Sequence, residues 1–488
     1  MNFIEPILRH ARLQPSAPAL LEGERTMTYA ELADRVLRAA GYLAEVGIGQ
    51  GDSVGLCLKD DCEHLVVLLA IARVGGIAIE LDWRARPTER TRVVNELVPK
   101  LVIVASGIDI GGSCPKIALD DAWNAALERA QHAVDLPLDW HAPAALLGSS
   151  GTTGIPKFTM ATHLHLFLQA AAYLEMLPAT RRHRYLQTFP LYFSSGRKLC
   201  FAFLMRGDTV ILYPSLFSAA EFIETVSRFD VTTGLIAPSL VRQFLQMTGH
   251  RGPLFPSIEF LISVGAPLFP EEKSEALRQL TPKFYEGYGA TAIGLISLLR
   301  PGDMAERPTS VGRPHALIDF EVVDEDERPI GPDVSGRLRC RGPALTSPIV
   351  GSGLSSAEDF RNGWYYPGEL ASIDSLGFLY LKGRISEVIY RGGAKIFPAE
   401  VEAVLHAHDA VIESAVLAIR SSGNENEQVL VAYVTCGRSV TAGELIAHCR
   451  THLTAFKIPR QINIISALPK NSSGKIDKVA LRLLAESQ

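Results

Sequence analysis

Three glycines, separated by pairs of hydroxyl residues, and a closing lysine occupy residues 148 to 157, in the order Gly-Ser-Ser-Gly-Thr-Thr-Gly-Ile-Pro-Lys. The apolar stretch from Ala144 to Leu147 precedes them and predicts a short buried strand. Glycines allow close backbone approach, and backbone N–H groups, hydroxyls and an ammonium together suit an anion. We interpret the run as a polyphosphate loop, with a plain polar turn as the alternative. It is not a Walker A loop, because Pro156 precedes Lys157 and Phe158 follows it.

The composition is that of a globular protein with ample core. The chain has 488 residues, of which 47% are hydrophobic and 21% charged, and its formal net charge is −5. This length predicts two or more domains. The small negative charge and the lack of a basic block argue against a nucleic-acid partner.

The sequence carries no signal for export or membrane insertion. Met1 to Leu21 predicts the start of an amphipathic helix and not a signal peptide, and no apolar run reaches membrane-spanning length. The seven cysteines are scattered without a CxxC pair, so we expect reduced thiols and a cytoplasmic location. His163 and His165 lack nearby partners for a zinc site, and we expect no protein-bound metal.

Strands and helices alternate along the first 280 residues, which predicts parallel sheets covered by helices. A capping box, Thr28 with Glu31, starts one helix. The predicted helices cover 65–74 and 239–247, and the predicted strands cover 54–58, 77–81, 101–105, 208–213 and 234–237.

The chain changes character towards its end. Strands at 320–324 and 336–341 belong to a small β-rich piece with many turn signals. After Arg384 a compact unit follows, with helices at 398–406 and 441–453 and strands at 388–390, 412–419, 429–435 and 461–465. We expect an N-terminal domain over 1–384 and a C-terminal domain over 385–488.

Five separated motifs then coincide in order, and together they resemble the adenylate-forming superfamily of acyl-CoA synthetases, adenylation domains and luciferases. The resemblance runs from about Phe3 to Leu484. The matching segments are Ser149 to Lys157, Tyr288 to Thr291, Gly363 to Glu369, Gly383 to Glu402, and Pro469 to Ile476.

The resemblance implies a fold: a large N-terminal domain of two αβ layered subdomains with a small β-barrel-like piece, and a small mobile α+β C-terminal domain. It also implies activation of a carboxylic acid by ATP, with pyrophosphate release, followed by thioester formation. Lys475, Thr291 and Lys157 are then the catalytic candidates. The implied nucleotide-binding residues are Ser149, Ser150, Gly151, Thr152, Thr153, Gly154, Lys157, Gly287, Tyr288, Gly289, Ala290, Thr291, Glu369, Arg384 and Lys475.

The same resemblance places the acyl group and the thiol. Tyr192, Phe193 and Gly265 are the implied acyl-binding residues, although core packing is a close rival for Phe193. Gly392 and Gly393 are implied to line a pantetheine tunnel, with Ser386 as the hinge. Arg197 and Lys198 hint at a second anionic group on the acid, but a solvated face is the preferred interpretation of both.

Several residues depart from the family pattern. Ala292 occupies the position of a glutamate that helps to hold Mg²⁺, so the Mg²⁺ site is in question. Glu369 replaces an aspartate, Pro367 a threonine and Phe158 a glycine. Ser386 stands where aspartate or lysine is common, and serine still permits a hinge rotation.

We therefore predict an acyl- or aryl-CoA ligase that uses ATP, CoA and Mg²⁺. Two alternatives remain: an adenylating enzyme that loads a carrier protein, and a degenerate homologue that binds a ligand without efficient catalysis. The sequence indicates neither the acid nor the oligomeric state.

Overall fold

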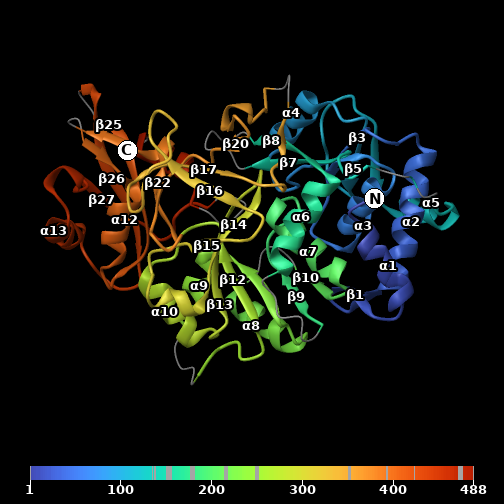
Figure 1. Cartoon of the computed structure of the whole chain (residues 1–488), viewed down its shortest axis with the longest axis horizontal. Coiled ribbons are helices and arrows are strands. Elements are labelled where there is room, and N and C mark those ends of the chain that lie inside the picture. The colour runs from blue at the N-terminus through green and yellow to red at the C-terminus, as the bar shows by residue number, and fades with distance from the viewer. Residues whose placement is uncertain are drawn as a thin grey trace.

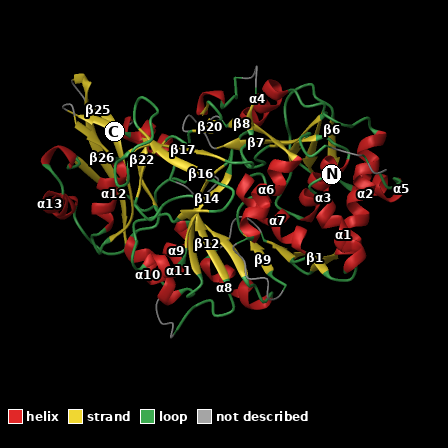
Figure 2. Cartoon of the chain, in the orientation of Figure 1, coloured by secondary structure: helices red, strands yellow, loops and turns green. Residues whose placement is uncertain are grey.

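The computed structural model describes residues 2–133, 136, 139–149, 156–175, 182–213, 218–247, 252–349, 353–391, 394–421, 424–470 and 476–486. The two ends of the chain lie on opposite sides of an elongated molecule (Figure 1). Strands and helices are mixed throughout, with the helix-rich layers on the amino-terminal side (Figure 2). No helix in these ranges is long and apolar enough to cross a membrane.

A nine-stranded sheet, which we call sheet A, has the order β15-β14-β13-β12-β11-β9-β10-β1-β2. Neighbours from β1 to β13 are parallel, and the pairings of β2, β14 and β15 are antiparallel. The strands are β1 (Pro18–Glu22), β2 (Arg25–Thr28), β9 (Arg184–Gln187), β10 (Thr209–Leu212), β11 (Thr233–Ile236), β12 (Phe260–Val264), β13 (Phe284–Ala290), β14 (Gly294–Leu299) and β15 (Arg313–Pro314).

A seven-stranded sheet, sheet B, has the order β18-β8-β7-β4-β3-β5-β6. It is parallel from β7 to β6, and β8 and β18 are added antiparallel. The strands are β3 (Ser53–Cys57), β4 (Ile77–Glu80), β5 (Leu101–Ala105), β6 (Lys116–Leu119), β7 (Pro143–Ser149), β8 (Lys157–Thr162) and β18 (Ser347–Pro348).

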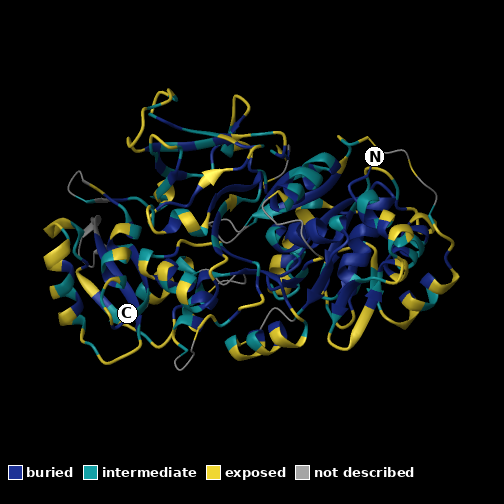
Figure 3. Cartoon of the chain, turned by 60° about the horizontal axis from the view of Figure 1, so that its bottom comes forward, coloured by how far each residue is buried: buried dark blue, intermediate teal, exposed yellow. Residues whose placement is uncertain are grey.

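Helices between the two sheets form the largest core. Helix α3 is almost entirely apolar, and all of its residues except Glu63 are buried. One apolar cluster joins this layer to strands of both sheets, and it appears as the dark interior of Figure 3. The helices that contribute to the cluster are α1 (Glu5–Leu13), α2 (Tyr29–Glu45), α3 (Cys62–Arg73), α5 (Asp121–Arg129), α6 (His163–Leu174) and α7 (Ser194–Arg206). The predicted capping box of Thr28 and Glu31 starts α2.

The outer faces of the sheets are covered separately. Helix α4 (Pro87–Leu97) packs on sheet B. The helices that pack on sheet A are α8 (Ala219–Arg228), α9 (Pro238–Leu245), α10 (Pro270–Gln279) and α11 (Pro301–Met304). The predicted arrangement of two layered αβ subdomains is confirmed.

The β-rich piece is a six-stranded antiparallel sheet, sheet C. Its strands are β16 (Asp319–Val323), β17 (Gly336–Arg341), β19 (Phe360–Arg361), β20 (Trp364–Tyr365), β21 (Glu369–Ile373) and β22 (Leu379–Arg384), with a short helix η1 (Ala357–Asp359) before β19.

After Arg384 the chain forms an α+β unit with its own apolar clusters. The elements are η2 (Ile385–Glu387), β23 (Ile389–Arg391), β24 (Ala394–Ile396), α12 (Pro398–His406), β25 (Val411–Ser421), β26 (Asn424–Cys436), α13 (Ala442–His452), η3 (Ala455–Lys457), β27 (Gln461–Ile464) and α14 (Lys478–Glu486). We call residues 385–486 the carboxyl-terminal part; the domain boundary itself stays a prediction.

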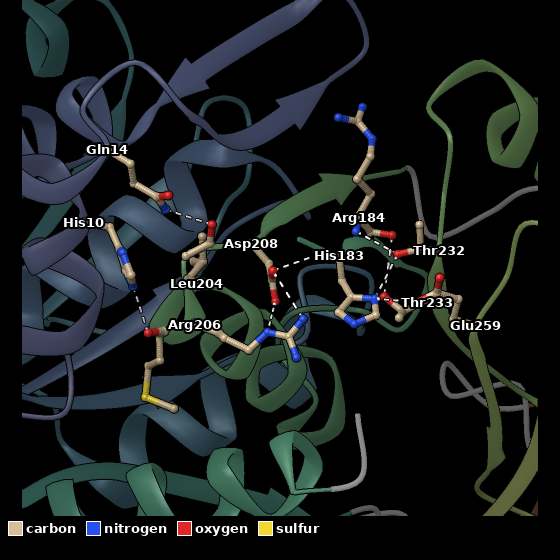
Figure 4. Close-up of polar contacts among 12 residues, drawn as sticks. His10, Gln14, His183, Arg184, Leu204, Arg206, Asp208, Thr232, Thr233 and Glu259 are labelled. Carbon is tan, nitrogen blue, oxygen red and sulfur yellow. Dashed lines mark hydrogen bonds and ion pairs between the residues drawn. The ribbon is translucent and has the colours of Figure 1, made fainter. Parts of the chain in front are cut away.

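Polar side chains join the amino ends of three strands of sheet A (Figure 4). Asp208, which is buried, accepts hydrogen bonds from the His183 backbone N–H at 2.8 Å and from Arg206 Nε at 2.7 Å. Thr232 Oγ1 accepts one from the Arg184 backbone N–H at 2.9 Å. These contacts provide hydrogen-bond partners for backbone and charged groups at the amino ends of the strands.

The carboxyl-terminal part docks on the outer helices of sheet A through His406. Its Nε2 lies 3.2 Å from Glu272 Oε1, and its ring stacks on Phe269 with centroids 4.0 Å apart. Arg242 Nε lies 2.6 Å from the same carboxylate oxygen. Burial raises the pKa of Glu272, but His406 and Arg242 outweigh it, and the net pKa is lowered. The contact therefore favours the charged carboxylate and holds α12 against α10.

We expect His406→Ala to loosen this docking, because it removes both the stacked ring and one charged hydrogen bond. Trypsin cleavage after Arg384, whose side chain is 44% exposed, becomes about 10-fold faster. His452→Ala, on the exposed side of α13, is the matched control. An unchanged cleavage rate in the His406 variant would show that this contact does not hold the two parts together.

Candidate functional site

The residues that the sequence assigns to a site follow the carboxyl ends of parallel strands. The segment with Tyr192 and Phe193 follows β9, Gly265 follows β12, and the polyphosphate loop follows β7. In open α/β sheets, ligands bind just outside the carboxyl ends of the strands, because the connecting loops and helix starts diverge there. Sheets A and B therefore both direct their predicted site segments to the carboxyl ends of their strands.

The ends of the polyphosphate loop are held together by β7 and β8. Ser149 pairs with Lys157 in the ladder, and Ser149 Oγ donates a hydrogen bond to the Lys157 carbonyl oxygen at 3.2 Å. Lys157 Nζ forms an ion pair with Glu358 of η1. An anionic ligand at this lysine must compete with Glu358. Five predicted residues lie outside the described ranges: Ser150, Gly151, Thr152, Thr153 and Gly154.

Phe158 is a core residue and does not reach the site. Its side chain is 2% exposed and belongs to the apolar cluster under sheet B. A Cβ on Gly148 would lie only 3.0 Å from the ring, so the ring rests directly on this glycine. The Phe158 backbone N–H also donates to the Leu354 carbonyl oxygen at 2.8 Å. This packing explains how the loop tolerates a phenylalanine beside its lysine.

The predicted adenine turn is the hairpin between β13 and β14. Gly287, Tyr288, Gly289 and Ala290 form the end of β13, and Thr291 follows them. A Cβ on Gly289 would lie 2.5 Å from the Gly294 carbonyl oxygen, so only glycine fits there. Thr291 is partly exposed at the tip of this turn.

Tyr288, Glu369 and Arg384 converge from sheets A and C. Arg384 Nε lies 3.3 Å from Glu369 Oε1, and the two residues pair across β21 and β22. The Tyr288 hydroxyl is buried and forms no hydrogen bond within the described residues. Burial, followed by the Glu369 charge, raises the pKa of Tyr288 well above its ordinary value. The predicted ribose carboxylate is thus 8% exposed and not a solvated turn residue.

The position of the expected Mg²⁺ ligand is apolar. Ala292 is buried, and its carbonyl oxygen accepts hydrogen bonds from Gln169 Nε2 at 3.4 Å and the Thr346 backbone N–H at 2.9 Å. The described ranges contain no group of three potential metal-ligating side chains. Ala292 therefore supplies no carboxylate for Mg²⁺, and the side-chain oxygens beside it that lack a partner among the described residues, Gln169 Oε1 and Thr346 Oγ1, are neutral.

His163, the histidine considered for a metal site, packs in the core. It is fully buried, neither ring nitrogen has a partner among the described residues, and burial lowers its pKa to about 4. Its ring packs on Phe3 with centroids 5.7 Å apart.

The predicted acyl segment contains an aromatic pair fixed from the opposite sheet. Tyr192 and Phe193 pack with ring centroids 4.3 Å apart. Arg84, in the loop after β4, donates from Nη2 to the Tyr192 hydroxyl at 3.2 Å. Gly265 is exposed and has a φ of 105°, a conformation that glycine adopts at no steric cost. The side chains after β4 and β9 therefore meet over this segment.

The preferred interpretation of Arg197 and Lys198 as a solvated face is wrong, because each is only 3% exposed. Arg197 Nη1 donates to the Leu191 and Tyr192 carbonyl oxygens at 2.9 and 2.7 Å, and it lies 3.5 Å from Glu80 Oε1. These contacts use its charge inside the protein, so Arg197 fixes the acyl segment and is not available to a substrate anion.

His64 completes the buried charge network. Its Nε2 lies 3.0 Å from Glu80 Oε2. Burial lowers the pKa of His64, but the Glu80 carboxylate outweighs burial and the net pKa is raised. Glu80 thus joins α3 to α7 at the carboxyl end of β4.

Lys198 points to the adenine turn. Its Nζ donates a hydrogen bond to the Thr291 carbonyl oxygen at 3.3 Å. Burial, followed by the neighbouring Arg197 charge, lowers the pKa of Lys198 to about 7. The lysine thus connects the acyl-segment helix α7 with the predicted α-phosphate contact.

The predicted hinge is tied to the last helix. Ser386 is exposed in η2, and the next residue, Glu387, lies 2.6 Å from Lys478 Nζ of α14. Lys478 also pairs with Glu402 of α12 at 3.2 Å. Burial lowers the pKa of Lys478, but the two carboxylates outweigh it and raise the net pKa. Lys475, Gly392 and Gly393 lie outside the described ranges.

Comparison with known proteins places the chain in a family. The AMP-binding enzyme model matches residues 7–349, and the AMP-binding enzyme C-terminal domain model matches residues 400–475. The fold and these matches define an adenylate-forming enzyme. The chain belongs to the AMP-binding enzyme family, which confirms the resemblance inferred from its motifs.

The curated relatives include acid–CoA ligases of similar length. A 2-succinylbenzoate–CoA ligase of Bacillus subtilis is 29% identical over 478 residues, covering 96% of each chain. A feruloyl-CoA synthase of Amycolatopsis is 29% identical over 493 residues, covering 97% of each. The solved o-succinylbenzoate CoA synthetase of Bacillus subtilis, in complex with its acyl-adenylate, has a TM-score of 0.85 at 26% identity, covering 98% of this chain and 97% of that one.

Three contacts of the site carry no signal in the sequence. Glu80, Glu358 and Lys478 lie far along the chain from the groups they pair with. The alternation of strands and helices could have placed Glu80 at the carboxyl end of a strand. Nothing in the local sequence indicates its partner.

We expect Phe158→Ala to lower the free energy of unfolding by about 3–5 kcal/mol, because it leaves a cavity under sheet B. Thermal and denaturant unfolding measure the loss, and Phe158→Leu, which keeps most of the volume, is the milder control. If Phe158→Ala kept full stability and bound ATP more tightly, the ring would be an obstruction in the site and not part of the core.

Proposed function

We propose that this protein is an AMP-forming acid–thiol ligase. A carboxylate oxygen of the acid forms a bond to the α-phosphorus of ATP, and the bond to pyrophosphate breaks. A thiolate then forms a bond to the acyl carbon, and AMP leaves. The observation that carries the proposal is the match to acid–CoA ligases over nearly the whole of both chains.

The proposed nucleotide site uses residues from three sheets. Lys157 and the loop before it bind the terminal phosphates, Thr291 contacts the α-phosphate, and Glu369 accepts hydrogen bonds from the ribose hydroxyls beside Arg384. These contacts position the reacting groups and stabilise charge on the phosphate oxygens. Mg²⁺ would be held mainly by the nucleotide phosphates, because the described residues contain no cluster of three acidic, histidine or cysteine side chains that could hold it.

The proposed second half-reaction requires the carboxyl-terminal part to rotate about Ser386. Lys475 serves adenylation and is then withdrawn, and Gly392 and Gly393 line the thiol's approach. CoA is the preferred thiol, because the relatives are named as CoA ligases. A carrier protein is the alternative, and direct competition between the two thiols separates them.

The proposed acid contains an aromatic ring, which carries the carboxyl group directly or through a side chain. Relatives named for 2-succinylbenzoate, ferulate and indoleacetate point to this class. The Tyr192–Phe193 pair offers an aromatic wall of the kind that stacks on a planar ring.

Carboxylate-dependent exchange of pyrophosphate into ATP tests the proposal. We expect exchange with at least one of 2-succinylbenzoate, ferulate, indoleacetate and benzoate, and background exchange with hexadecanoate. ATP binding without exchange for any acid would instead indicate a degenerate homologue. Repeating the assay at limiting Mg²⁺ measures how far the loss of a glutamate at position 292 weakens the ion's contribution.

The division between half-reactions is tested with Lys475→Ala. We expect exchange to fall by at least about 100-fold, since a charged contact to the reacting groups is lost. Thioester formation from supplied acyl-adenylate should stay within a few-fold of the unmodified protein. Equal loss of both steps would contradict the withdrawal of Lys475.

A further inference from the structure

Lys198 is a lysine of α7 whose side chain is buried. It is 3% exposed, and no ion pair joins it to a carboxylate in the described part of the chain. Among the described residues, its ammonium donates a hydrogen bond to the Thr291 carbonyl oxygen at a long 3.3 Å. Burial disfavours the charged ammonium and lowers the Lys198 pKa to about 7, and a negative group that arrives beside it would favour the charged form again.

Two carboxylates contact Arg197 or the acyl segment, and neither pairs with Lys198. Glu80 lies between His64 and Arg197, with contacts of 3.0 and 3.5 Å. Asp60 Oδ1 accepts a hydrogen bond from the Leu191 backbone N–H at 2.5 Å. These two charges stabilise the acyl segment and the neighbouring Arg197, and neither forms an ion pair with Lys198.

A packing role alone does not explain a lysine here. Methionine has a similar length and fills a buried position without a desolvation cost. The ammonium instead points at the turn where the proposed function brings two anions, the acid's carboxylate and the α-phosphate of ATP. The two anions repel each other, and an ammonium at Lys198, whose charged form they favour, lowers that repulsion.

Resting on the proposed function, we propose that Lys198 binds the carboxylate of the acid and holds it beside Thr291 for attack on ATP. Because α7 belongs to the large amino-terminal part, this cation is in place before the carboxyl-terminal part brings Lys475. Once the carboxylate oxygen is bonded to phosphorus, the acyl carboxylate has lost its charge, and Lys198 contributes less to the thioester step.

The test is Lys198→Met, measured first by acid-dependent pyrophosphate exchange at saturating ATP with the best acid of the panel above. We expect kcat/KM for the acid to fall about 30-fold or more, with KM for ATP changed less than threefold. Thioester formation from supplied acyl-adenylate should fall less than fivefold. Lys198→Ala should recover exchange when propylammonium is added, and not when the uncharged propanol is added.

Two controls separate the outcomes. Lys283→Met, at an exposed lysine, should leave exchange and melting temperature unchanged. If Lys198→Met kept kcat/KM for the acid within threefold, or lost ATP binding and both half-reactions equally, Lys198 would not be a carboxylate-binding residue. If the unmodified protein exchanged with no acid, the proposed function would fail, and this inference would fall with it.

Discussion

The ion pair between Glu80 and Arg197 joins the layers of the two sheets near the carboxyl ends of their strands, where the site is proposed. Glu80 ends β4 of sheet B, and Arg197 lies on α7, which follows β9 of sheet A. Both side chains are buried, so their attraction is weakly screened, but each also pays a large desolvation cost. The cost is offset by His64 and by the two carbonyl oxygens that Arg197 binds. Removing either charge would leave the other buried between the sheets without its ion-pair partner.

The position of the acyl segment follows from this pair. Because the carbonyl oxygens belong to Leu191 and Tyr192, Arg197 fixes the backbone that carries the aromatic wall. Arg84 then reaches the Tyr192 hydroxyl from the other sheet. The next residue along α7, Lys198, is thereby aimed at Thr291. One buried contact thus determines the position of the aromatic wall. It also orients Lys198, the cation of α7 that contacts the adenine turn in the described part of the chain.

The sequence predicts the layered fold and the order of its elements, and it proposes the segments of the site. These depend on local signals: apolar periodicity, capping residues such as Thr28, and glycine-rich turns. Contacts between residues that lie far apart in the chain, such as Glu80 and Arg197, have no such local signal. The sequence therefore favours a solvated face for Arg197 and Lys198, because charged residues are mostly exposed and the elements that cover these two cannot be identified from the sequence. Phe158 was recognised as a departure, but its burial against Gly148 depends on the β7–β8 ladder. The roles of the site residues stay predictions.

The path of one oxygen atom tests the central claim most directly. If a carboxylate oxygen attacks the α-phosphorus, an acid labelled with ¹⁸O in its carboxylate transfers one labelled oxygen to AMP as the thioester forms. Mass spectrometry of the nucleotide product measures this transfer. The account predicts AMP that carries a single ¹⁸O and pyrophosphate that carries none. Label in inorganic phosphate, with ADP as the nucleotide product, would instead show an acyl-phosphate route and contradict the account.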